Sequence, residues 1–359
     1  MPYRSLWQIG KENKVKTVNT IIVPVLILSF LTGCGGPKEQ KKPAVETGKG
    51  KVLFTVDFEQ GKVLRYKFVS NRTTEILLAG STDDQKNKAN KYTESMEMVM
   101  AYNPVKVNAY GLSTIEAKCE SMKITKNLPT GARKDAAENF AGKTFTFTVG
   151  PSGKITDYSR MEALINETAE KAFRENSTQG RIKEPDMVND FLATQWFLWD
   201  SISSIPHPSE GAAVGQIWKS QLSIPISLIM HQARDVEYKL QEIRDSQNGK
   251  IAVIDSTFSL SKSSPQGWRI PYRDSFQMSG PFGFYVNCRG SDLQGKGQEL
   301  FNIDAGKSLG YEQSYKMTVT AALMIPLGGI SPKITIDQKL SMQLLDDTEK
   351  GASQTVGGK

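Results

Sequence analysis

The stretch Ser95-Met-Glu-Met-Val-Met-Ala-Tyr102 places Met96, Met98, Met100 and Tyr102 at every second position. Side chains of a strand point alternately to the two faces of a sheet, so a period of two indicates a half-buried strand. A row of methionines also suits copper ligation or a pliable lipid-binding surface. The alternation favours the simpler interpretation, in which the methionines form the inward face of a strand.

Similar segments lie on both sides of this row. Residues 63–69 and 113–123 alternate apolar with charged side chains. The sequence Phe147-Thr-Val-Gly-Pro-Ser-Gly153 predicts a hairpin, because glycine and proline supply the turn. A further strand is expected at 52–58, and strand-like sequence returns at 215 and continues to 345.

The period changes to that of a helix between the two strand-rich stretches. Ser159 and Glu162 have the spacing of a capping box, and apolar residues follow at helical intervals. A second helix is expected to begin at Pro185, since proline is favoured in the first turn. Its aromatic face comprises Phe191, Trp196 and Trp199. This face either packs on the sheet or lines a site for an apolar ligand.

These patterns predict an α+β fold that is mostly antiparallel β. Strands grouped before and after the helices exclude a parallel α/β fold. Tyr66-Lys-Phe68 is echoed by Tyr238-Lys-Leu240, which suggests two related β-meanders joined by a helical insert, as a curved sheet or half-barrel. The expected segments are a signal peptide (1–33), a lipidated cysteine with a flexible tether (34–51), the first meander (52–158), the helical insert (159–205), the second meander (206–345) and a loose tail (346–359).

The N-terminal leader indicates export. Four basic residues precede an apolar run that ends at Leu31 and is shorter than the roughly 20 residues of a membrane-spanning helix. The run is followed by Leu31-Thr-Gly-Cys34, which resembles the lipobox of bacterial lipoproteins. The resemblance implies cleavage between Gly33 and Cys34 and a covalent lipid on Cys34, while an ordinary secretory signal is the alternative. Gly35 after the lipidated cysteine favours the outer membrane, facing the periplasm.

Composition narrows the range of partners. The whole chain carries a net charge of +7, and removal of residues 1–33, with four basic residues and one acidic residue, leaves +4. This modest excess is scattered rather than gathered in a basic stripe, so nucleic acid is not expected as a partner. The expected partners are the membrane, through the lipid anchor, and an envelope protein, glycan or lipid.

Two cysteines remain after Cys34. In an oxidising envelope Cys119 and Cys288 can form a disulfide that joins the two halves of the chain. Otherwise each is a small buried apolar residue. With only two isolated histidines beside them, His207 and His231, no metal site and no cofactor other than the lipid is expected.

No catalytic constellation is evident. Gly290-Ser-Asp-Leu-Gln-Gly-Lys-Gly297 approaches a P-loop but lacks the Ser or Thr that follows its lysine, which favours a glycine-rich turn. Neither histidine lies in the context of a known nucleophile motif. The protein is therefore expected not to be an enzyme.

Four segments show a resemblance to a family of bacterial envelope lipoproteins with a domain of unknown function. They are Gly61-Lys-Val-Leu-Arg-Tyr-Lys-Phe68, Phe147 to Lys154, Pro206 to Trp218, and Phe301 to Lys307. The resemblance implies the two-meander architecture over residues 52–345 and implies no activity.

The sequence thus predicts a membrane-anchored envelope lipoprotein that acts as a non-enzymatic binding or structural module. The alternative is a carrier or sensor of an apolar, lipid-like ligand, and an envelope hydrolase is the less favoured third hypothesis. A carrier requires a cavity with apolar walls, whereas an enzyme requires a cleft with converging titratable groups.

Overall fold

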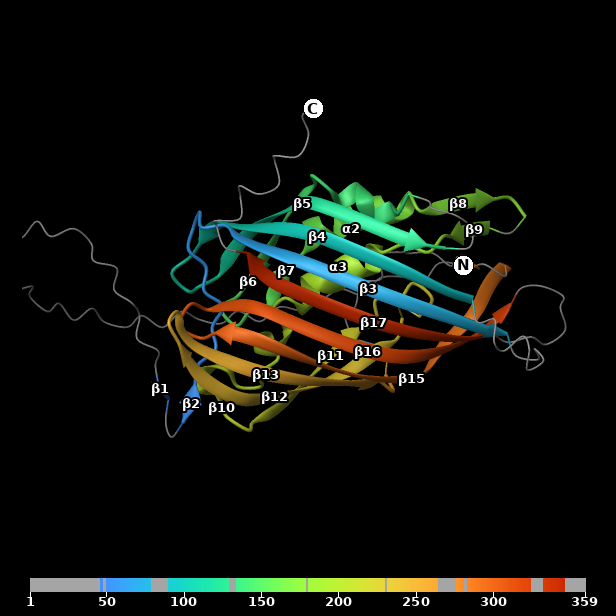
Figure 1. Cartoon of the computed structure of the whole chain (residues 1–359). Coiled ribbons are helices and arrows are strands. Elements are labelled where there is room, and N and C mark those ends of the chain that lie inside the picture. The colour runs from blue at the N-terminus through green and yellow to red at the C-terminus, as the bar shows by residue number, and fades with distance from the viewer. Residues whose placement is uncertain are drawn as a thin grey trace, which may run out of the picture. The chain divides into compact units, whose positions relative to one another are not determined.

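One large antiparallel sheet makes up most of the structure, a computed structural model (Figure 1). The structure describes residues 46–47, 50–78, 90–128, 134–178, 180–229, 231–263, 276–280, 283–323 and 332–345. The chain divides into residues 1–41 and a second unit, residues 42–359, which holds every described residue.

The sheet has fourteen strands, and the order along its main path is β11-β12-β13-β15-β16-β17-β3-β4-β5-β6-β7. It curves without closing, so β11 and β7 form its two edges. The bounds are β3 (Leu64–Leu78), β4 (Asn90–Val107), β5 (Ser113–Asn127), β6 (Thr144–Val149), β7 (Ile155–Asp157), β11 (Ile217–Ser223), β12 (Ala233–Ser246), β13 (Gly249–Leu260), β15 (Gly283–Asn302), β16 (Lys307–Leu323) and β17 (Pro332–Leu345).

Three short strands lie off this path, and three more make a small separate sheet. Strands β8 (Phe173–Asn176), β9 (Gly180–Lys183) and β14 (Gln277–Gly280) extend the large sheet at one end of β15, where β14 pairs with β9 in parallel. Strands β1 (Glu46–Thr47), β2 (Lys51–Val52) and β10 (Ala212–Ala213) form the small sheet. The predicted class, mostly antiparallel β with a helical insert and a curved sheet, is confirmed.

The two halves of the chain meet at a single seam. Strand β17 pairs with β3 in an antiparallel register that runs from Pro332 opposite Leu78 to Leu345 opposite Arg65. The N-terminal strands continue from β3 on one side, and the C-terminal strands continue from β17 on the other. The two meanders therefore form one sheet, a point that the sequence left open.

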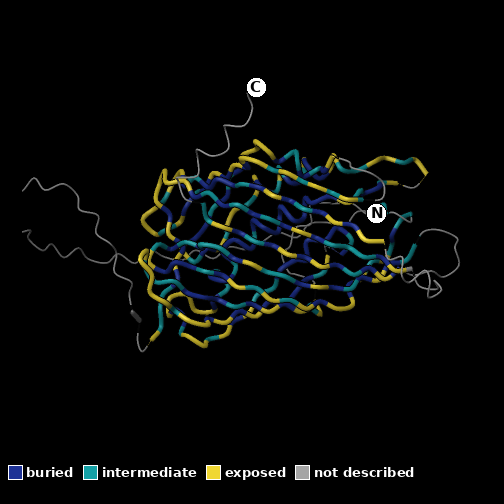
Figure 2. Tube along the Cα trace, in the orientation of Figure 1, coloured by how far each residue is buried: buried dark blue, intermediate teal, exposed yellow. Residues whose placement is uncertain are grey.

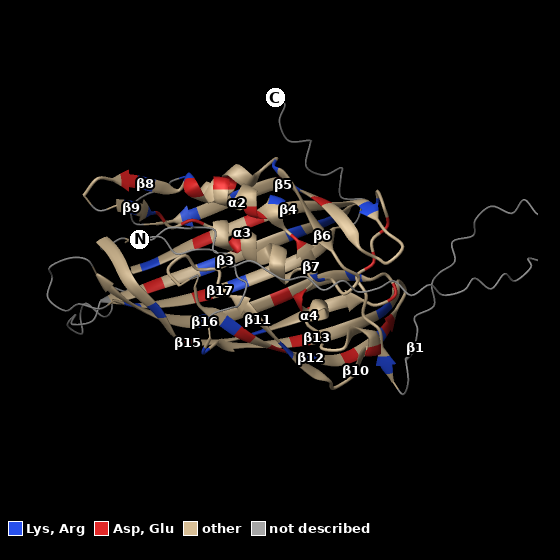
Figure 3. Cartoon of the chain, turned by 180° about the vertical axis from the view of Figure 1, so that it is seen from behind, with Lys and Arg blue, Asp and Glu red and all other residues tan. Residues whose placement is uncertain are grey.

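The helices lie over the concave face of the sheet (Figure 3). They are α2 (Ser159–Glu170), α3 (Val188–Phe197) and α4 (Asp200–Ser203), with the 3₁₀ turns η1 (Ala136–Phe140) and η2 (Pro208–Glu210). Nearly every residue of α3 is buried, so it is a core helix surrounded on all sides rather than a surface helix with one apolar stripe.

Two details of the predicted helices are wrong. Ser159 does not cap α2, because Asp157 accepts a hydrogen bond from the Ser159 amide at 3.0 Å in its place. The predicted second helix begins at Val188 rather than Pro185, and it ends at Phe197, so that a separate short helix follows from Asp200.

Alternation along the strands matches the predicted pattern. Met96, Met98, Met100 and Tyr102 are fully buried on the concave side, which confirms that the methionine row is the inward face of a strand. Figure 2 shows buried and exposed residues alternating along the long strands.

The segment 53–59 is not the strand that its sequence predicts. Its amides instead bond to the tips of two hairpins, with Val56 N donating to Pro151 O at 2.8 Å and Asp57 N donating to Gly306 O at 3.1 Å. Both tips carry a glycine with positive φ, and neither position has room for a side chain. A Cβ at Gly153 would lie 2.9 Å from Val56, and one at Gly306 would lie 2.6 Å from Asp57 N. The hairpins 147–154 and 301–307, which resemble each other in sequence, therefore both bind this segment.

The glycine-rich run from Gly290 to Gly297 is also not a turn. It lies within β15, and its glycines are required where neighbouring strands approach closely. A Cβ at Gly295 would lie 2.4 Å from Cβ of Tyr315 on β16.

Candidate functional site

A cavity of about 390 Å³ opens at the end of the sheet where β3 ends and β4 begins. This volume lies within the range of small-molecule binding sites. The walls are largely apolar and come from β3, β4, β14, β17 and the segment after β11; they include Ile76, Tyr92, Ile226, Met278, Ile334 and Ile336.

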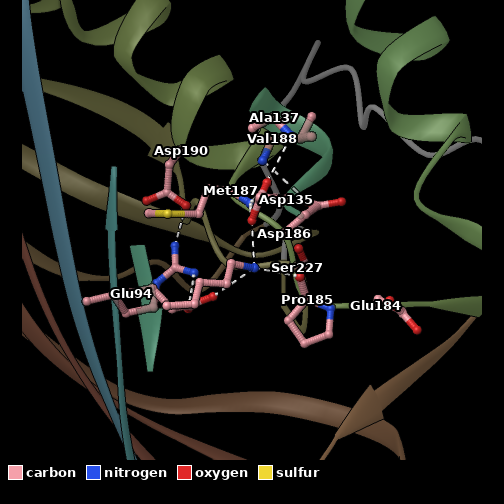
Figure 4. Close-up of polar contacts among 12 residues, drawn as sticks. Glu94, Asp135, Ala137, Glu184, Pro185, Asp186, Met187, Val188, Asp190 and Ser227 are labelled. Carbon is pink, nitrogen blue, oxygen red and sulfur yellow. Dashed lines mark hydrogen bonds and ion pairs between the residues drawn. The ribbon is translucent and has the colours of Figure 1, made fainter. Parts of the chain in front are cut away.

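A group of buried charged side chains lies beside the cavity, and four of its five members line it. We call this group the ionic floor, and it consists of Arg72, Glu94, Lys126, Asp135 and Asp190. Arg72 Nη2 contacts Asp190, and its Nη1 lies 3.2 Å from Glu94. Lys126 Nζ lies 3.3 Å from Glu94 and 2.6 Å from Asp135. Figure 4 shows Glu94, Asp135 and Asp190 gathered in this group.

Asp190 joins α3 to the seam of the sheet. Its carboxylate accepts hydrogen bonds from Ser70 Oγ on β3 and from Gln338 Nε2 on β17, both at 2.9 Å, besides its contact with Arg72. Arg72 Nε donates in turn to Gln338 Oε1 at 2.9 Å. Every member of this group is buried, so each charge depends on these partners in place of water.

Asp135, at the start of η1, likewise joins a segment outside the sheet to the sheet. It accepts hydrogen bonds from the amides of Ala137, at 2.8 Å, and of Met187, at 3.2 Å. Because Lys126 on β5 contacts the same carboxylate, Asp135 links the sheet to the residues that precede α3.

The pKa values of Glu94 and Arg72 fit charged side chains, whereas burial raises the pKa of Asp190 above its usual value. Burial alone would raise the pKa of Glu94, but Arg72 and Lys126 lower it below its usual value. Burial alone would lower the pKa of Arg72, but Asp190 and Glu94 raise it above its usual value. Arg72 and Lys126 therefore offset part of the negative charge of Glu94, Asp135 and Asp190.

Two tyrosine hydroxyls on the cavity wall lack a partner. The hydroxyls of Tyr92 and Tyr285 are buried and make no hydrogen bond to any described residue. Burial and the proximity of Tyr285 raise the pKa of Tyr92, so its hydroxyl stays protonated and available as a donor. Both tyrosines line the cavity, and their hydroxyls are buried donors.

The rim of the cavity is basic. Its exposed charged side chains, Lys134, Lys171 and Arg174, are all cations. Lys171 pairs with Glu167 and Arg174 pairs with Glu184, whereas Lys134 has no ion-pair partner within the described ranges. Among the described residues of the rim, Lys134 is therefore the cation that remains to attract a negatively charged group.

A second buried polar network lies away from the cavity, beneath α4. Asp200 accepts hydrogen bonds from Tyr238 at 2.6 Å and from Ser220 at 3.0 Å. Glu299 accepts hydrogen bonds from Ser201 at 2.5 Å and from Ser308. Burial raises the pKa of Asp200 to about 6 and that of Glu299 to about 7.

Among the residues singled out from the sequence, those that the structure describes are not at the cavity. Gly33 and Cys34 lie outside the described residues. Phe191 and Trp199 are buried in the core, where Phe191 stacks on Phe140 and Trp199 packs against Phe58, Tyr102 and Phe147. Trp196 is half-buried against Tyr158. The aromatic face is therefore a packing surface.

The structure does not bear out the expected disulfide. Cys119 and Cys288 are both free thiols. They belong to β5 and β15, which are separated by four intervening strands of the sheet, each step being about 4.8 Å. Burial raises the pKa of Cys119 to about 12 and that of Cys288 to about 11, so neither thiol is activated.

The described residues contain neither a candidate metal-ion cluster nor a candidate membrane-spanning helix. They contain no group of three or more His, Cys, Asp or Glu side chains placed to hold a metal ion. In the same part of the chain, no helix combines the length and the apolar character needed to span a membrane.

No protein-family model and no curated protein sequence matches the chain. A structure described as "lipid-protein interactions in lipovitellin" aligns with a TM-score of 0.40 and 9% identity; it covers 81% of this chain, and the chain spans only 26% of that one.

Two other structures align less well. DynF from the dynemicin biosynthesis pathway of Micromonospora chersina gives a TM-score of 0.18 at 8% identity, with 88% and 95% of the two chains covered. OccK8 (OprE) of Pseudomonas aeruginosa gives 0.15 at 10% identity, with 80% and 99% covered. All three TM-scores are below 0.5.

Replacement of Asp190 by Asn is expected to destabilise the protein by about 3–5 kcal/mol, because it leaves the buried charge of Arg72 with one carboxylate fewer. Chemical denaturation followed by tryptophan fluorescence measures this change. Glu97→Gln is the matched control, since Glu97 pairs with Lys67 at the surface at 3.1 Å and its loss should cost less than about 0.5 kcal/mol. Equal effects of the two substitutions would contradict the role given to Asp190.

The raised pKa of Glu299 makes stability depend on pH. The folded protein binds a proton on Glu299 up to about pH 7, whereas the unfolded chain releases it near 4.5. The stability gained in this way is complete below about pH 4.5 and is lost as pH rises through about 7. Glu299→Gln should flatten the decline over that window, as measured by denaturation at each pH, and the exposed Glu312→Gln should leave it unchanged. An unaltered decline in the Glu299 variant would refute this assignment.

Proposed function

We propose that the protein is an envelope lipoprotein, anchored through Cys34, that binds an amphipathic ligand in the cavity and performs no chemistry on it. The single observation that supports this most is the combination of an apolar wall with two unpartnered tyrosine hydroxyls, Tyr92 and Tyr285. An apolar chain fits the isoleucine-rich wall, and an oxygen of the ligand accepts hydrogen bonds from the hydroxyls.

The charge of the rim supports an anionic head group. Lys134, Lys171 and Arg174 are exposed at the mouth, while each acidic member of the ionic floor is paired with Arg72 or Lys126. A fatty-acid-like or phospholipid-like molecule combines the required features, namely an apolar tail, polar oxygens and negative charge.

A non-enzymatic role is favoured by the same network. Each ionised group of the floor is held by fixed hydrogen bonds and ion pairs, so a base or a nucleophile would first have to break them. The floor therefore acts as a rigid support for the wall.

The cavity lies far from the point where the chain enters the folded unit. Residues 50–61 are held near the start of β3, whereas Thr74 and Ile76 of the cavity are near its end. Leu64 and Thr74 are ten residues apart on β3, which corresponds to about 33 Å. With a lipid on Cys34, the mouth is then free to face away from the anchoring membrane.

Residues 42–359, incubated with total envelope lipid extract, should carry a stoichiometric lipid adduct in native mass spectrometry. The paired variant Tyr92→Phe and Tyr285→Phe should bind about tenfold more weakly, since each lost hydrogen bond contributes about 0.5–1.5 kcal/mol. Tyr110→Phe, at a tyrosine that is 87% exposed, serves as the control. A clean apo mass across the extract would argue against a ligand carrier and favour a structural or protein-binding module.

The anchor is tested separately in cells. Wild-type protein should incorporate radioactive palmitate, and Cys34→Ser should not, because only a thiol forms the thioether. Cys119→Ser is the control, as that thiol is buried in β5 and should not affect labelling. Labelling that persists in the Cys34 variant would contradict the lipobox assignment.

A further inference from the structure

Arg234 is a fully buried cation that no carboxylate of the described residues contacts. It lies on β12, and its guanidinium carbon is 4.5 Å from the ring centroid of Phe197, 4.6 Å from that of Phe258 and 5.1 Å from that of Tyr315. Over the described ranges its one hydrogen bond runs from Nη1 to Gln313 Oε1 at 3.3 Å. The rings attract the charge through their faces but cannot accept its remaining hydrogen bonds in the plane of the guanidinium.

Several hydrogen-bond donors near Arg234 are unsatisfied together. Arg234 Nε and Nη2, the hydroxyls of Tyr311 and Tyr315, and the amide nitrogen of Gln313 are all buried and have no partner among the residues that the structure describes. Tyr311, Gln313 and Tyr315 occupy alternate positions on β16, and Arg234 interacts electrostatically with both tyrosines. All of these groups can donate, and the cluster contributes no unsatisfied carbonyl or carboxylate oxygen.

The nearby carboxylates do not satisfy the donors around Arg234. Asp200 and Glu299 are each occupied by two hydroxyl donors, Tyr238 with Ser220 and Ser201 with Ser308 respectively. Asp200 acts on Arg234 electrostatically without forming an ion pair with it. The buried positive charge therefore lacks a contacting negative one.

The backbone beneath the cluster fixes its position. At Gly297 of β15, a Cβ would lie 3.0 Å from Cβ of Gln313, and at Gly295 one would meet Tyr315 at 2.4 Å. The absence of side chains at these two positions lets Gln313 and Tyr315 lie directly against β15. This accounts for the glycines that resemble a P-loop in the sequence.

We propose that Arg234, Tyr311, Gln313 and Tyr315 form a binding site for one small monovalent anion, with chloride as its physiological occupant. A single halide accepts hydrogen bonds from several donors and neutralises the guanidinium, whereas a water molecule accepts only two and brings no charge. The three rings that pack around Arg234 select a monatomic anion over an organic one. This site is independent of the ligand cavity, which has a different lining.

Crystals of the full chain grown in sodium bromide test the site directly. Anomalous scattering should show one bromide within hydrogen-bonding distance of Arg234 and Tyr315. A peak without anomalous signal at that position would identify a water molecule and overturn the proposal.

A solution measurement gives an independent test. In non-ionic detergent, the thermal midpoint of the full chain should rise with chloride, at ionic strength held constant with gluconate. The rise should be about 3 °C at ten times the dissociation constant. Tyr315→Phe and Tyr311→Phe, which keep the rings and remove one donor each, should reduce this rise, and Arg234→Met should abolish it.

Tyr92→Phe is the matched control, because Tyr92 is a buried tyrosine of the separate cavity. It should keep the full response to chloride. A thermal midpoint of the wild type that does not change with chloride would overturn the anion site. An equal response to chloride in the Tyr315 and Tyr92 variants would overturn it as well. Should Arg234→Met fail to fold, the two Tyr→Phe variants still decide the question.

Discussion

The ion pair between Arg72 and Asp190 is the interaction on which the rest of the structure depends. It fixes α3 to the concave face, and the same two side chains reach Ser70 on β3, Glu94 on β4 and Gln338 on β17. Burial makes each charge costly unless all of these partners are present. One ionic contact therefore sets the position of the central helix, the alignment of the seam and the group beside the cavity that we call the ionic floor.

Much of the fold follows from local sequence. The alternation around Met96 to Tyr102 predicted strands, and the change of period after Ser159 predicted the helical insert. The predictions were wrong in detail where tertiary contacts override local sequence preferences. Segment 53–59 is held by hairpin tips rather than by a neighbouring strand, and Asp157 replaces Ser159 as the cap. The run from Gly290 to Gly297 has the composition of a turn, yet its glycines serve a close strand contact.

The candidate site was harder to predict, because its members are far apart in sequence. Arg72 is separated from Asp190 by 118 residues and from Gln338 by 266. One signal was nevertheless present: Arg72 is in phase with Tyr66 and Phe68, and Glu94 is in phase with Met96, so both charges occupy inward positions of their strands. The sequence indicated Phe191 and Trp199 as candidate ligand-contacting residues instead, because composition alone does not distinguish a core helix from a binding surface.

The seam between β17 and β3 also sets the order of folding. The central position of the sheet is filled by the last described strand, so β3 lacks one neighbour until residues 332–345 have been made. Contacts between residues so far apart in the sequence form late and slowly, because the entropy of closing a long loop is lost before the contacts stabilise the fold. The sheet thus stays incomplete at β3 until the last described strand has been made. It commits to its final form only once its C-terminal strand has arrived.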